Sequence, residues 1–584
     1  MKKTNITLAI VFVFASLIAN AQYGQRTYYT DTLTNESFQK GIISNQNLYA
    51  GYPTYVGTGF VNTGTTAVAS RARFVRTKQA GTTLANLRYY IFKGAEMSAR
   101  SNSIADGASL FVMAGGVQHS TAIPGGSDIL IMKTNTNGIP TAPRRVDLGT
   151  SYDEALCVIH SSFNTSKYIT CGYSVSNGIS RVFVMKHNST GSTINWVRHF
   201  SLPCATGVTG SSRANFVVED PATGNIYVMG TVNTTAAGCR SSFLLKLNQA
   251  GAFQWLYIYT FPNGTGVDFN SIKPTESANR FIIAGTVGTT ALNNRPLLMR
   301  VDVTGAAPVT VFSNMLFSNG PTPNYPIASQ TGLDVCTRIK TTTVEYFLCG
   351  ATTYTFGSTD GHIFKCNSGG FPISAKLYNW PYNDELRSIS SHRITDTVAV
   401  GLVAFGKYGF GPSTAVSRER SWLLKSYYNL VTGCADLTDS LYFSPITLSK
   451  FYYQPVISTN YTADSMTVQY GNCLEKKLCW ANVIAAGSNL KVENELQSAQ
   501  NGDLKLYPNP LSGNELTMEL NSSTDETAHV RIYNAIGQTV ESFEVQLSQG
   551  INLVKGEMNE TMKGWYIVEV TGSQKIYRAK LLKQ

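Results

Sequence analysis

Short apolar runs that end in glycine recur along most of the chain and predict buried β-strands. Each run holds about five residues, rich in β-branched and aromatic side chains, which favours strands over helices. The glycines that end the runs lie 51 to 65 residues apart, so one structural unit repeats at a nearly constant period. The runs are Phe111–Gly115, Tyr168–Gly172, Ile226–Gly230, Phe281–Gly285, Tyr346–Gly350 and Val398–Gly401, with a weaker first copy at Tyr55–Gly57.

A second apolar run keeps phase with the first and ends in Lys or Arg, as in Ile129–Lys133 and Val182–Lys186. A turn glycine follows, and an aromatic strand marked by Trp196, Trp255 or Phe312 comes next. The turn glycines are Gly138, Gly191, Gly251, Gly305 and Gly369. Four strands per repeat predict a β-propeller of about seven blades over residues 22–442, with six or eight blades as alternatives.

This body resembles the loosely defined propellers of secreted bacterial proteins, a resemblance that implies a fold and no activity. Its period is longer than those of WD and kelch repeats, and their signature residues are absent. A parallel β-helix has much shorter repeats, and an array of β-sandwiches needs linkers richer in proline. Residues 443–500 lose the pattern, and we expect them to supply closing strands or a cap and then a linker.

The last eighty or so residues return to strict alternation of apolar and polar positions, as in Leu516–Leu520 and Val530–Tyr533. This pattern predicts short half-buried strands and a small β-sandwich over residues 501–584. Prolines stiffen the segment that leads into it, because they remove backbone donors and fix the chain direction. The residues that mark this region are Tyr507, Pro508, Asn509, Pro510, Gly537, Gly564 and Tyr566.

These motifs, in this order at the chain end, resemble the C-terminal sorting domain of proteins exported by the type IX secretion system of Bacteroidetes. A generic binding module of the fibronectin type is the alternative. The resemblance implies that the type IX secretion translocon recognises the tail. It also implies removal of the tail and either release or attachment to lipopolysaccharide. The expected location is therefore the extracellular space or the outer cell surface, reached through the periplasm.

The N-terminal residues of the chain also predict export. Lys2 and Lys3 precede an apolar run from Ile6 to Ile18, and small residues follow up to Ala21. This order predicts a signal peptide over residues 1–21, cleaved between Ala21 and Gln22. An uncleaved anchor is the alternative. No later run approaches the roughly eighteen apolar residues that would span a bilayer.

The composition is typical of an extracellular β-protein, and the charge distribution favours some kinds of binding partner over others. Only 14% of the 584 residues are charged, while Gly totals 50, Tyr 31 and Phe 27. The formal charge of +11 is spread along the chain instead of forming a basic block. This distribution argues against nucleic acid as a partner and favours anionic surfaces such as polysaccharide or lipopolysaccharide.

The ten cysteines predict disulfides, because an exported chain meets an oxidising environment. We expect Cys157 to pair with Cys171 and Cys336 with Cys349, since both pairs fall on the first two strands of a repeat. Cys204 is expected to join Cys239. The pairing of the remaining cysteines stays open, namely Cys366, Cys434, Cys473 and Cys479. Zinc is the competing interpretation, but the sequence has no Cys-x-x-Cys pair.

Catalytic patterns are sparse, so we assign no catalytic, cofactor or metal residue. The sequence has no His-Glu-x-x-His motif, no Gly-x-Ser-x-Gly elbow and no EF-hand loop. Asp153–Glu154 and Asp384–Glu385 stand at repeat starts, where acids either stabilise turns or serve a glycosidase as acid and base.

Three functions remain, and the first is favoured. It is binding or adhesion to a glycan or protein through rim loops, such as Ser313–Ser329 and Tyr408–Gly411. The second is hydrolase or lyase activity on an extracellular polysaccharide at the channel mouth, and the third is a structural surface layer. Carboxylates or a histidine at the mouth would favour the enzyme, and an aromatic, uncharged rim would favour binding.

Overall fold

The chain folds into β-strands throughout the part that a computed structural model describes, residues 22–482 and 504–584 apart from short internal gaps. The chain divides into two compact units, Met1–Glu493 and Asn494–Gln584. None of the described residues forms a helix long and apolar enough to cross a membrane. The predicted all-β fold is confirmed, and the predicted signal peptide lies outside the described residues. The internal gaps are residues 30–34, 50–51, 63–69, 78–82, 93–97, 119–125, 205–208, 235–238, 262–265, 278, 289–293, 319–326, 340–342, 356, 379–382, 394–398, 411–417, 427, 431, 433–435, 440, 460, 466–467, 473, 535–538, 559–562 and 573–575.

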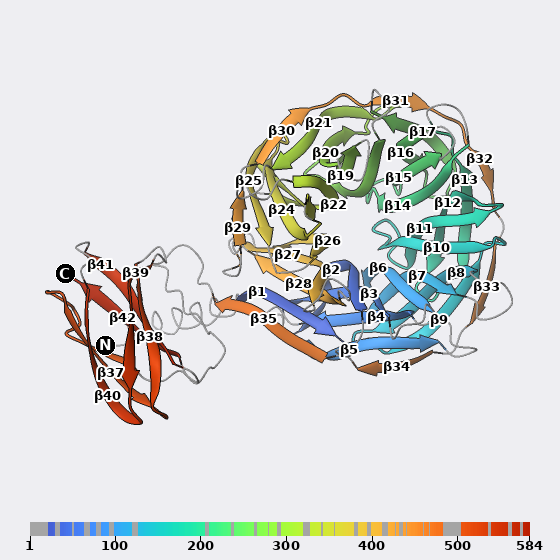
Figure 1. Cartoon of the computed structure of the whole chain (residues 1–584). Coiled ribbons are helices and arrows are strands. Elements are labelled where there is room, and N and C mark those ends of the chain that lie inside the picture. Colours follow the sequence, from blue (N-terminus) through green and yellow to red (C-terminus); the bar gives the residue numbers. More distant parts are fainter. Residues whose placement is uncertain are drawn as a thin grey trace, which may run out of the picture. The chain divides into compact units, whose positions relative to one another are not determined.

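The first unit is a ring of antiparallel sheets, each built from strands that follow one another in the sequence (Figure 1). The first two groups are β2 (Asn35–Tyr49), β3 (Tyr52–Asn62), β4 (Ser70–Thr77) and β5 (Thr83–Phe92), then β6 (Ala99–Gly107), β7 (Leu110–Gln118), β8 (Ser127–Asn135) and β9 (Pro140–Asp147). The next two are β10 (Tyr152–His160), β11 (Lys167–Ser176), β12 (Ile179–Asn188) and β13 (Ile194–Ser201), then β14 (Ser211–Glu219), β15 (Ile226–Thr234), β16 (Cys239–Leu247) and β17 (Phe253–Thr260).

The ring continues with three further groups. Two are β18 (Gly266–Pro274), β19 (Arg280–Gly288), β20 (Arg295–Asp302) and β21 (Val309–Ser318), then β22 (Ile327–Ile339), β23 (Val344–Tyr354), β24 (Thr359–Asn367) and β25 (Pro372–Tyr378). The last combines β26 (Glu385–Arg393), β27 (Ala399–Phe410) and β28 (Arg418–Ser426) with the N-terminal strand β1 (Gln22–Tyr29). Strands β8 and β10 share one parallel pair, Ser127 and Tyr152, which joins two groups into a single ten-stranded sheet.

The apolar runs identified in the sequence form the second and third strands of these groups. Both strands are buried on both faces, as in β7 and β8, because neighbouring sheets pack against each side. The aromatic residues Trp196, Trp255 and Phe312 lie on fourth strands, as predicted. Tyr408, expected in an exposed rim loop, instead lies in β27 and is buried. In the other expected loop, residues 319–326 lie outside the described part, and the flanking residues belong to β21 and β22.

Each repeat glycine lies opposite a β-bulge in the first strand of its sheet. In β10 the register shifts between Ala155 and Cys157, and Gly172 lies opposite Ala155. A Cβ atom on Gly172 would overlap the carbonyl oxygen of Glu154, so only glycine fits. The same overlap arises at Gly59, Gly115, Gly230, Gly285, Gly350 and Gly406. The repeat glycines at the two ends are therefore Gly59 and Gly406, not the predicted Gly57 and Gly401.

After β28 the chain runs back around the outside of the ring and adds one antiparallel strand to every group (Figure 1). We call this segment, Asp436–Asn482, the belt. Its strands meet the groups in reverse order, from β25 back to β5, and the last one pairs with β1. The belt strands are β29 (Asp436–Asp439), β30 (Leu441–Pro445), β31 (Ser449–Tyr452), β32 (Val456–Ser458), β33 (Thr462–Ser465), β34 (Val468–Asn472) and β35 (Leu474–Asn482).

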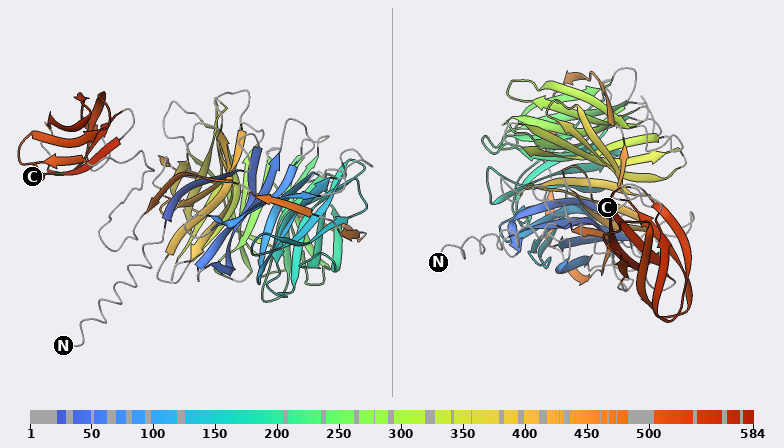
Figure 2. Two further views of the ribbon diagram at one scale, coloured as in Figure 1. Left: turned by 90° about the horizontal axis from the view of Figure 1, so that it is seen from below. Right: turned by 90° about the vertical axis from the view of Figure 1, so that its left-hand side faces the viewer.

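The second unit contains two small antiparallel sheets that share one apolar core (Figure 2). The core takes alternate residues of facing strands, such as Leu516, Met518 and Leu520 from one sheet and Val530 and Ile532 from the other. The first sheet is β36 (Leu504–Tyr507), β37 (Glu515–Ser522) and β40 (Gly550–Glu557). The second is β39 (Thr539–Leu547), β38 (Glu526–Tyr533), β41 (Gly564–Thr571) and β42 (Ile576–Lys583).

Candidate functional site

The residue that follows each bulge on the first strands is directed toward the centre of the ring. In β2 this residue is Lys40, opposite Thr58, and in β22 it is Asp334, opposite Cys349. Lys40 Nζ donates to Asp334 Oδ2 at 2.8 Å, although another sheet, which begins with β26, stands between their two sheets. The side chains therefore meet inside the ring. The full set is Lys40, Ser103, Cys157, Phe216, Ser271, Asp334 and Ser388.

Asp334 is the buried anion of this layer, and it is fully hydrogen-bonded. Its side chain accepts from Lys40, Ser271 and Ser388, and from the backbone N–H groups of Ile389 and Val335. Burial alone would raise the pKa of Asp334, but Lys273 and Lys40 hold it far below its usual range. The carboxylate is therefore ionised whenever the protein is folded at ordinary pH.

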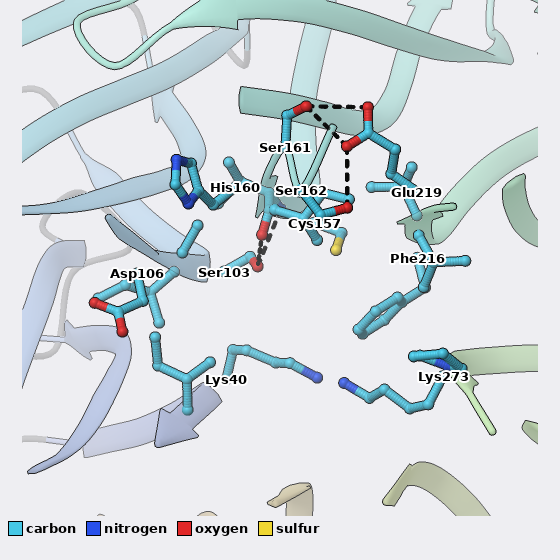
Figure 3. A pocket seen from close by; sticks show the side chains of 18 of the residues that line it. Lys40, Ser103, Asp106, Cys157, His160, Ser161, Ser162, Phe216, Glu219 and Lys273 are labelled. Atoms are coloured by element: carbon cyan, nitrogen blue, oxygen red, sulfur yellow. Dashed lines mark hydrogen bonds between the residues drawn. The ribbon is translucent and has the colours of Figure 1, made fainter. Parts of the chain in front are cut away.

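The ring of Phe216 lies beside two ammonium groups in this layer. The Nζ atoms of Lys40 and Lys273 are each 4.4 Å from the centre of its ring, a cation–π distance. Figure 3 shows both lysine side chains directed toward each other beside this ring. Lys273 Nζ is also 3.8 Å from Asp334 Oδ1, which is an ion pair but too long for a hydrogen bond. Two cations thus share one carboxylate.

Above this layer lies a cavity of about 500 Å³, within the size range of small-ligand sites. Residues of β2, β6, β10, β14 and β18 line it, all at or beyond the bulges. Apolar side chains such as Ile42, Ile159 and Val218 form much of the wall. Lys40 and Lys273 carry the positive charge (Figure 3). We call this cavity the central pocket.

The acids and the histidine of the central pocket are already engaged. Glu219 accepts from Ser161, the backbone N–H of Phe163 and Lys186, whose Nζ is 3.2 Å from Oε1. Asp106 accepts from Ser44 at 3.0 Å. His160 Nε2 lies 2.7 Å from the carbonyl oxygen of Thr165. These hydrogen bonds hold the three side chains in place.

The paired acids at the repeat starts are also structural. Asp153 accepts from the backbone N–H of Leu148 and, with Asp128 and Asp147, forms a group of three carboxylates. Burial raises the pKa of Asp153 to about 7, and the other two acids add to this shift. Arg145, with Nε 3.3 Å from Asp128 Oδ2, offsets part of the charge.

The neighbouring acids bind side chains and backbone groups in the same way. Glu154 accepts from Tyr152, Tyr173 and Asn102. Asp384 accepts from the backbone N–H of Gly409, and Glu385 forms an ion pair with Arg387. Asp153, Glu154, Asp384 and Glu385 do not line the central pocket, so they do not support a glycosidase site there.

The structure contradicts two of the predicted disulfides. Cys157 and Cys171 face each other across β10 and β11 but are free, buried thiols. Burial alone would raise the pKa of Cys157, yet a hydrogen bond from Cys171 and the two pocket lysines lower it. Cys336 and Cys349 are also free, because Cys336 lies opposite Phe347 and only diagonally from Cys349.

The other cysteines are only partly described. Cys366 is a free, buried thiol, and burial raises its pKa well above the usual range. Cys204 is disulfide-bonded, and its pairing with Cys239 stays a prediction, because the Cys239 side chain lies outside the described residues. Cys434, Cys473 and the side chain of Cys479 lie outside the described residues too.

The sorting motif lies at one end of the C-terminal unit. Tyr507 is half exposed at the end of β36. The Asn509 side chain donates a hydrogen bond to the carbonyl oxygen of Lys580 and accepts one from the backbone N–H of Leu582. Pro508 and Pro510 both follow cis peptide bonds. Gly564 opens β41 and Tyr566 is buried in the core. Gly537 and Ala21 lie outside the described residues, and Gln22 begins β1.

Residues 505–584 match the family model described as the secretion system C-terminal sorting domain. The C-terminal unit is a sorting domain of type IX secretion. This domain implies recognition by the type IX secretion machinery and transport across the outer membrane to the cell surface or the extracellular space. The family model covers none of the ring, so the sorting domain says nothing about the central pocket.

No curated protein matches the chain, and solved structures are similar to its body only at low identity. Sqt1 of Chaetomium thermophilum, bound to the N-terminus of ribosomal protein L10, is 11% identical over 65% of this chain and 84% of its own, with a TM-score of 0.35. The subtype N11 neuraminidase-like protein of A/flat-faced bat/Peru/033/2010 is 13% identical over 60% of this chain and 95% of its own, with a TM-score of 0.32. No activity follows from either likeness.

Deleting residues 504–584 is expected to stop export at the periplasm. The ring is a separate compact unit and keeps its own core without the tail, so the truncated chain should fold but lack the sorting signal. Cell fractionation and surface protease treatment of whole cells measure the outcome, with the intact chain as control. Finding the truncated chain at the cell surface would contradict the role of the tail.

Proposed function

We propose that this protein is an exported binding protein whose body, a seven-bladed β-propeller, holds a glycan unit in the central pocket. The blade count is supported by the groups of strands that begin with β2, β6, β10, β14, β18, β22 and β26. In this proposal the signal peptide covers residues 1–21, the propeller residues 22–442 and the sorting domain residues 501–584. Residues 443–500 hold most of the belt and a linker.

The shape of the site favours a small ligand unit over a protein surface. A stable protein interface buries about 800 Å² on each partner, usually over a broad and fairly flat area. The central pocket instead offers one concave cavity of about 500 Å³ at the ring centre. A sugar unit fits such a cavity, and Phe216 supplies an aromatic side chain beside it. This concave, centrally placed cavity is the single observation that carries the proposal.

The state of the acids favours binding over hydrolysis. A glycosidase needs one carboxyl group as an acid and a second as a nucleophile or base, and both must reach the substrate. Glu219 is bound by Lys186 and two serines, and Asp334 lies in a closed network of donors. A histidine at the mouth was expected to favour an enzyme. His160 does line the cavity, but its Nε2 atom is hydrogen-bonded to the Thr165 carbonyl oxygen.

A tryptophan at position 165 is expected to abolish glycan binding. Thr165 is exposed at the wall of the central pocket, so Thr165→Trp places a large ring over the cavity without disturbing the core. The matched control is Ser166→Trp, because Ser166 is the exposed neighbour that does not line the cavity. Retention of soluble extracellular polysaccharides on the immobilised mature chain measures binding.

The expected result is retention by the intact chain and by Ser166→Trp, and loss by more than tenfold in Thr165→Trp. Equal retention by both variants would place the site elsewhere, for example on a protein-binding rim. Product analysis of the same incubations separates binding from catalysis. Shortened or unsaturated polysaccharide products, absent with Thr165→Trp, would replace the proposal with a hydrolase or lyase.

After transport the sorting tail is removed, and the body is either released or attached to lipopolysaccharide. The belt ends at Asn482, before the sorting domain begins, so loss of the tail leaves every strand of the ring in place.

A further inference from the structure

We propose that the unit held in the central pocket carries a carboxylate, as an acidic sugar does. This inference rests on the binding function proposed above and names the chemistry of the ligand. Three observations carry it: the charge balance of the cavity, the missing hydrogen-bond partners of Lys273, and the position of Phe216 beside both cations.

The charge balance of the pocket floor is positive. Lys40 and Lys273 bring two cations and Asp334 one anion, and these three groups are in mutual contact. Two other carboxylates line the cavity, and each has a cation of its own outside it. Glu219 is compensated by Lys186, which is itself buried, and Asp106 interacts electrostatically with Arg76. One positive charge is therefore left over in a cavity with apolar walls, where an opposite charge is attracted more strongly than in water.

We assign the uncompensated positive charge to Lys273, because Lys40 is the closer partner of Asp334. Lys40 donates a hydrogen bond to Asp334 at 2.8 Å, whereas Lys273 lies 3.8 Å from the same carboxylate. Within the part of the chain that the structure describes, Lys273 donates no hydrogen bond, and its side chain keeps 24% of its surface exposed. An ammonium group has three donors, so Lys273 offers unused donors to a ligand.

A carboxylate suits this position better than a neutral hydroxyl. It accepts charge-assisted hydrogen bonds from Lys273 and neutralises the extra charge, and the ligand body can pack on the apolar walls. Phe216 stabilises both ammonium groups without cancelling their charge, so the attraction for an anion remains. The overall charge of +11 also draws polyanionic glycans to the molecule.

The test compares an acidic oligosaccharide with its neutral twin on the full mature chain. Trigalacturonate and its fully methyl-esterified form have the same sugar body, and in the ester a methyl group replaces the charge of each carboxylate. Isothermal titration is expected to show saturable binding of trigalacturonate at least tenfold tighter than that of the ester. Lys273→Met, which keeps the apolar stem, is expected to weaken trigalacturonate binding at least tenfold and to leave the ester unchanged.

The matched control is Lys167→Met, because Lys167 lies outside the central pocket. Thermal unfolding of each variant shows whether it is folded. Equal binding of the two sugars, or equal trigalacturonate binding by Lys273→Met and the intact chain, overturns this inference and leaves the proposed function standing. If no polysaccharide is retained in a manner sensitive to Thr165→Trp, the proposed function fails and this inference falls with it.

The pH profile supplies a second readout. Burial lowers the pKa of Lys273 to about 8, against the opposing effect of Asp334. Below pH 8 the ammonium form binds the carboxylate, and above it the neutral amine does not. Among the described residues, Asp334, Lys40, Cys336 and Cys157 face Lys273. Asp334 stays ionised, Cys336 stays neutral because its pKa is raised, and deprotonation of Cys157 adds negative charge.

Trigalacturonate affinity is therefore expected to fall at least tenfold between pH 7 and pH 9.5 in the intact chain. In Lys273→Met the weak residual binding is expected to lose most of that dependence. A pH profile that is the same in both proteins would contradict the role of Lys273.

Discussion

Residues 22–435, produced without the belt, are expected to melt at least about 10 °C below residues 22–482 or to aggregate on purification. The belt provides an outer strand for every group of the ring, and its removal exposes a row of backbone donors and acceptors on each one. It also removes β35, the strand that pairs with β1 on the side away from β28.

The belt also packs its aromatic side chains against rings at the outer edge of the sheets. Phe443 packs edge-on against Phe371 at 5.1 Å between ring centres, and Tyr452 against Tyr257 at 5.8 Å. Lys450 Nζ lies 5.4 Å from the ring centre of Tyr257. Removing these contacts leaves apolar rings on a surface that is rich in unpaired strand edges, which favours aggregation.

Differential scanning calorimetry of four proteins measures the effect. Residues 22–584 and 22–482 are the controls, because both keep the belt and should share the unfolding transition of the ring. Residues 22–472 lack only β35 and are expected to melt between the two extremes. A transition at the same temperature with and without residues 436–482 would show that the belt does not stabilise the ring.

The second large effect is expected at a repeat glycine. Gly230→Ala should destabilise the ring by about 3 kcal/mol, because the new Cβ atom would overlap the carbonyl oxygen of Arg213 at the bulge of β14. The strands must then separate or the bulge must shift. A shifted bulge would move Phe216 out of the pocket floor, so ligand binding should weaken together with stability.

Gly305→Ala is the matched control for this substitution. Its Cβ atom would find its nearest neighbour, the carbonyl oxygen of Ala307, at 3.6 Å, which is ordinary contact. The control should change stability by less than about 1 kcal/mol in either direction. Denaturant unfolding of both variants tests the account, and equal stability of Gly230→Ala and Gly305→Ala would refute the role given to the repeat glycines.

The sequence reveals the inner strands of the sheets because their burial is nearly complete. Leu110–Gln118 is buried along almost its whole length, which produces a continuous apolar run. The belt leaves no such signal. Ser449–Tyr452 is exposed at every residue and is held by backbone pairing with β17. Backbone pairing of this kind places little demand on the side chains. Its position in the ring could therefore not be read from hydrophobic pattern.

The central pocket could not be found in the sequence for a different reason. Lys40 and Asp334 are separated by 294 positions and meet only because the ring closes. Each of the seven residues that follow a bulge is joined to its repeat glycine by a hairpin. The separation in sequence varies from 12 to 19 residues with the length of the hairpin loop. A lysine at such a position looks like any surface lysine until the bulge that directs it inward is known.

The predicted Cys336–Cys349 disulfide was wrong because of the strand register. Cys336 and Cys349 lie on neighbouring strands, as the repeat pattern indicates, but the bulge between Gly332 and Asp334 places Cys349 opposite Asp334. The repeat pattern predicts the two strands, but it does not predict the bulge that adds a residue to one of them. The same bulge that prevents this cross-strand pairing turns Asp334 toward the pocket floor.

The most direct test of the account is an experimental structure of the mature chain with trigalacturonate bound. One oligosaccharide is expected at the ring centre, with a carboxylate within hydrogen-bonding distance of Lys273 Nζ and the sugar against the wall formed by Ile159 and Val218. An oligosaccharide bound on the outer rim, or in the pocket with its carboxylate directed away from Lys273 and Lys40, would contradict it.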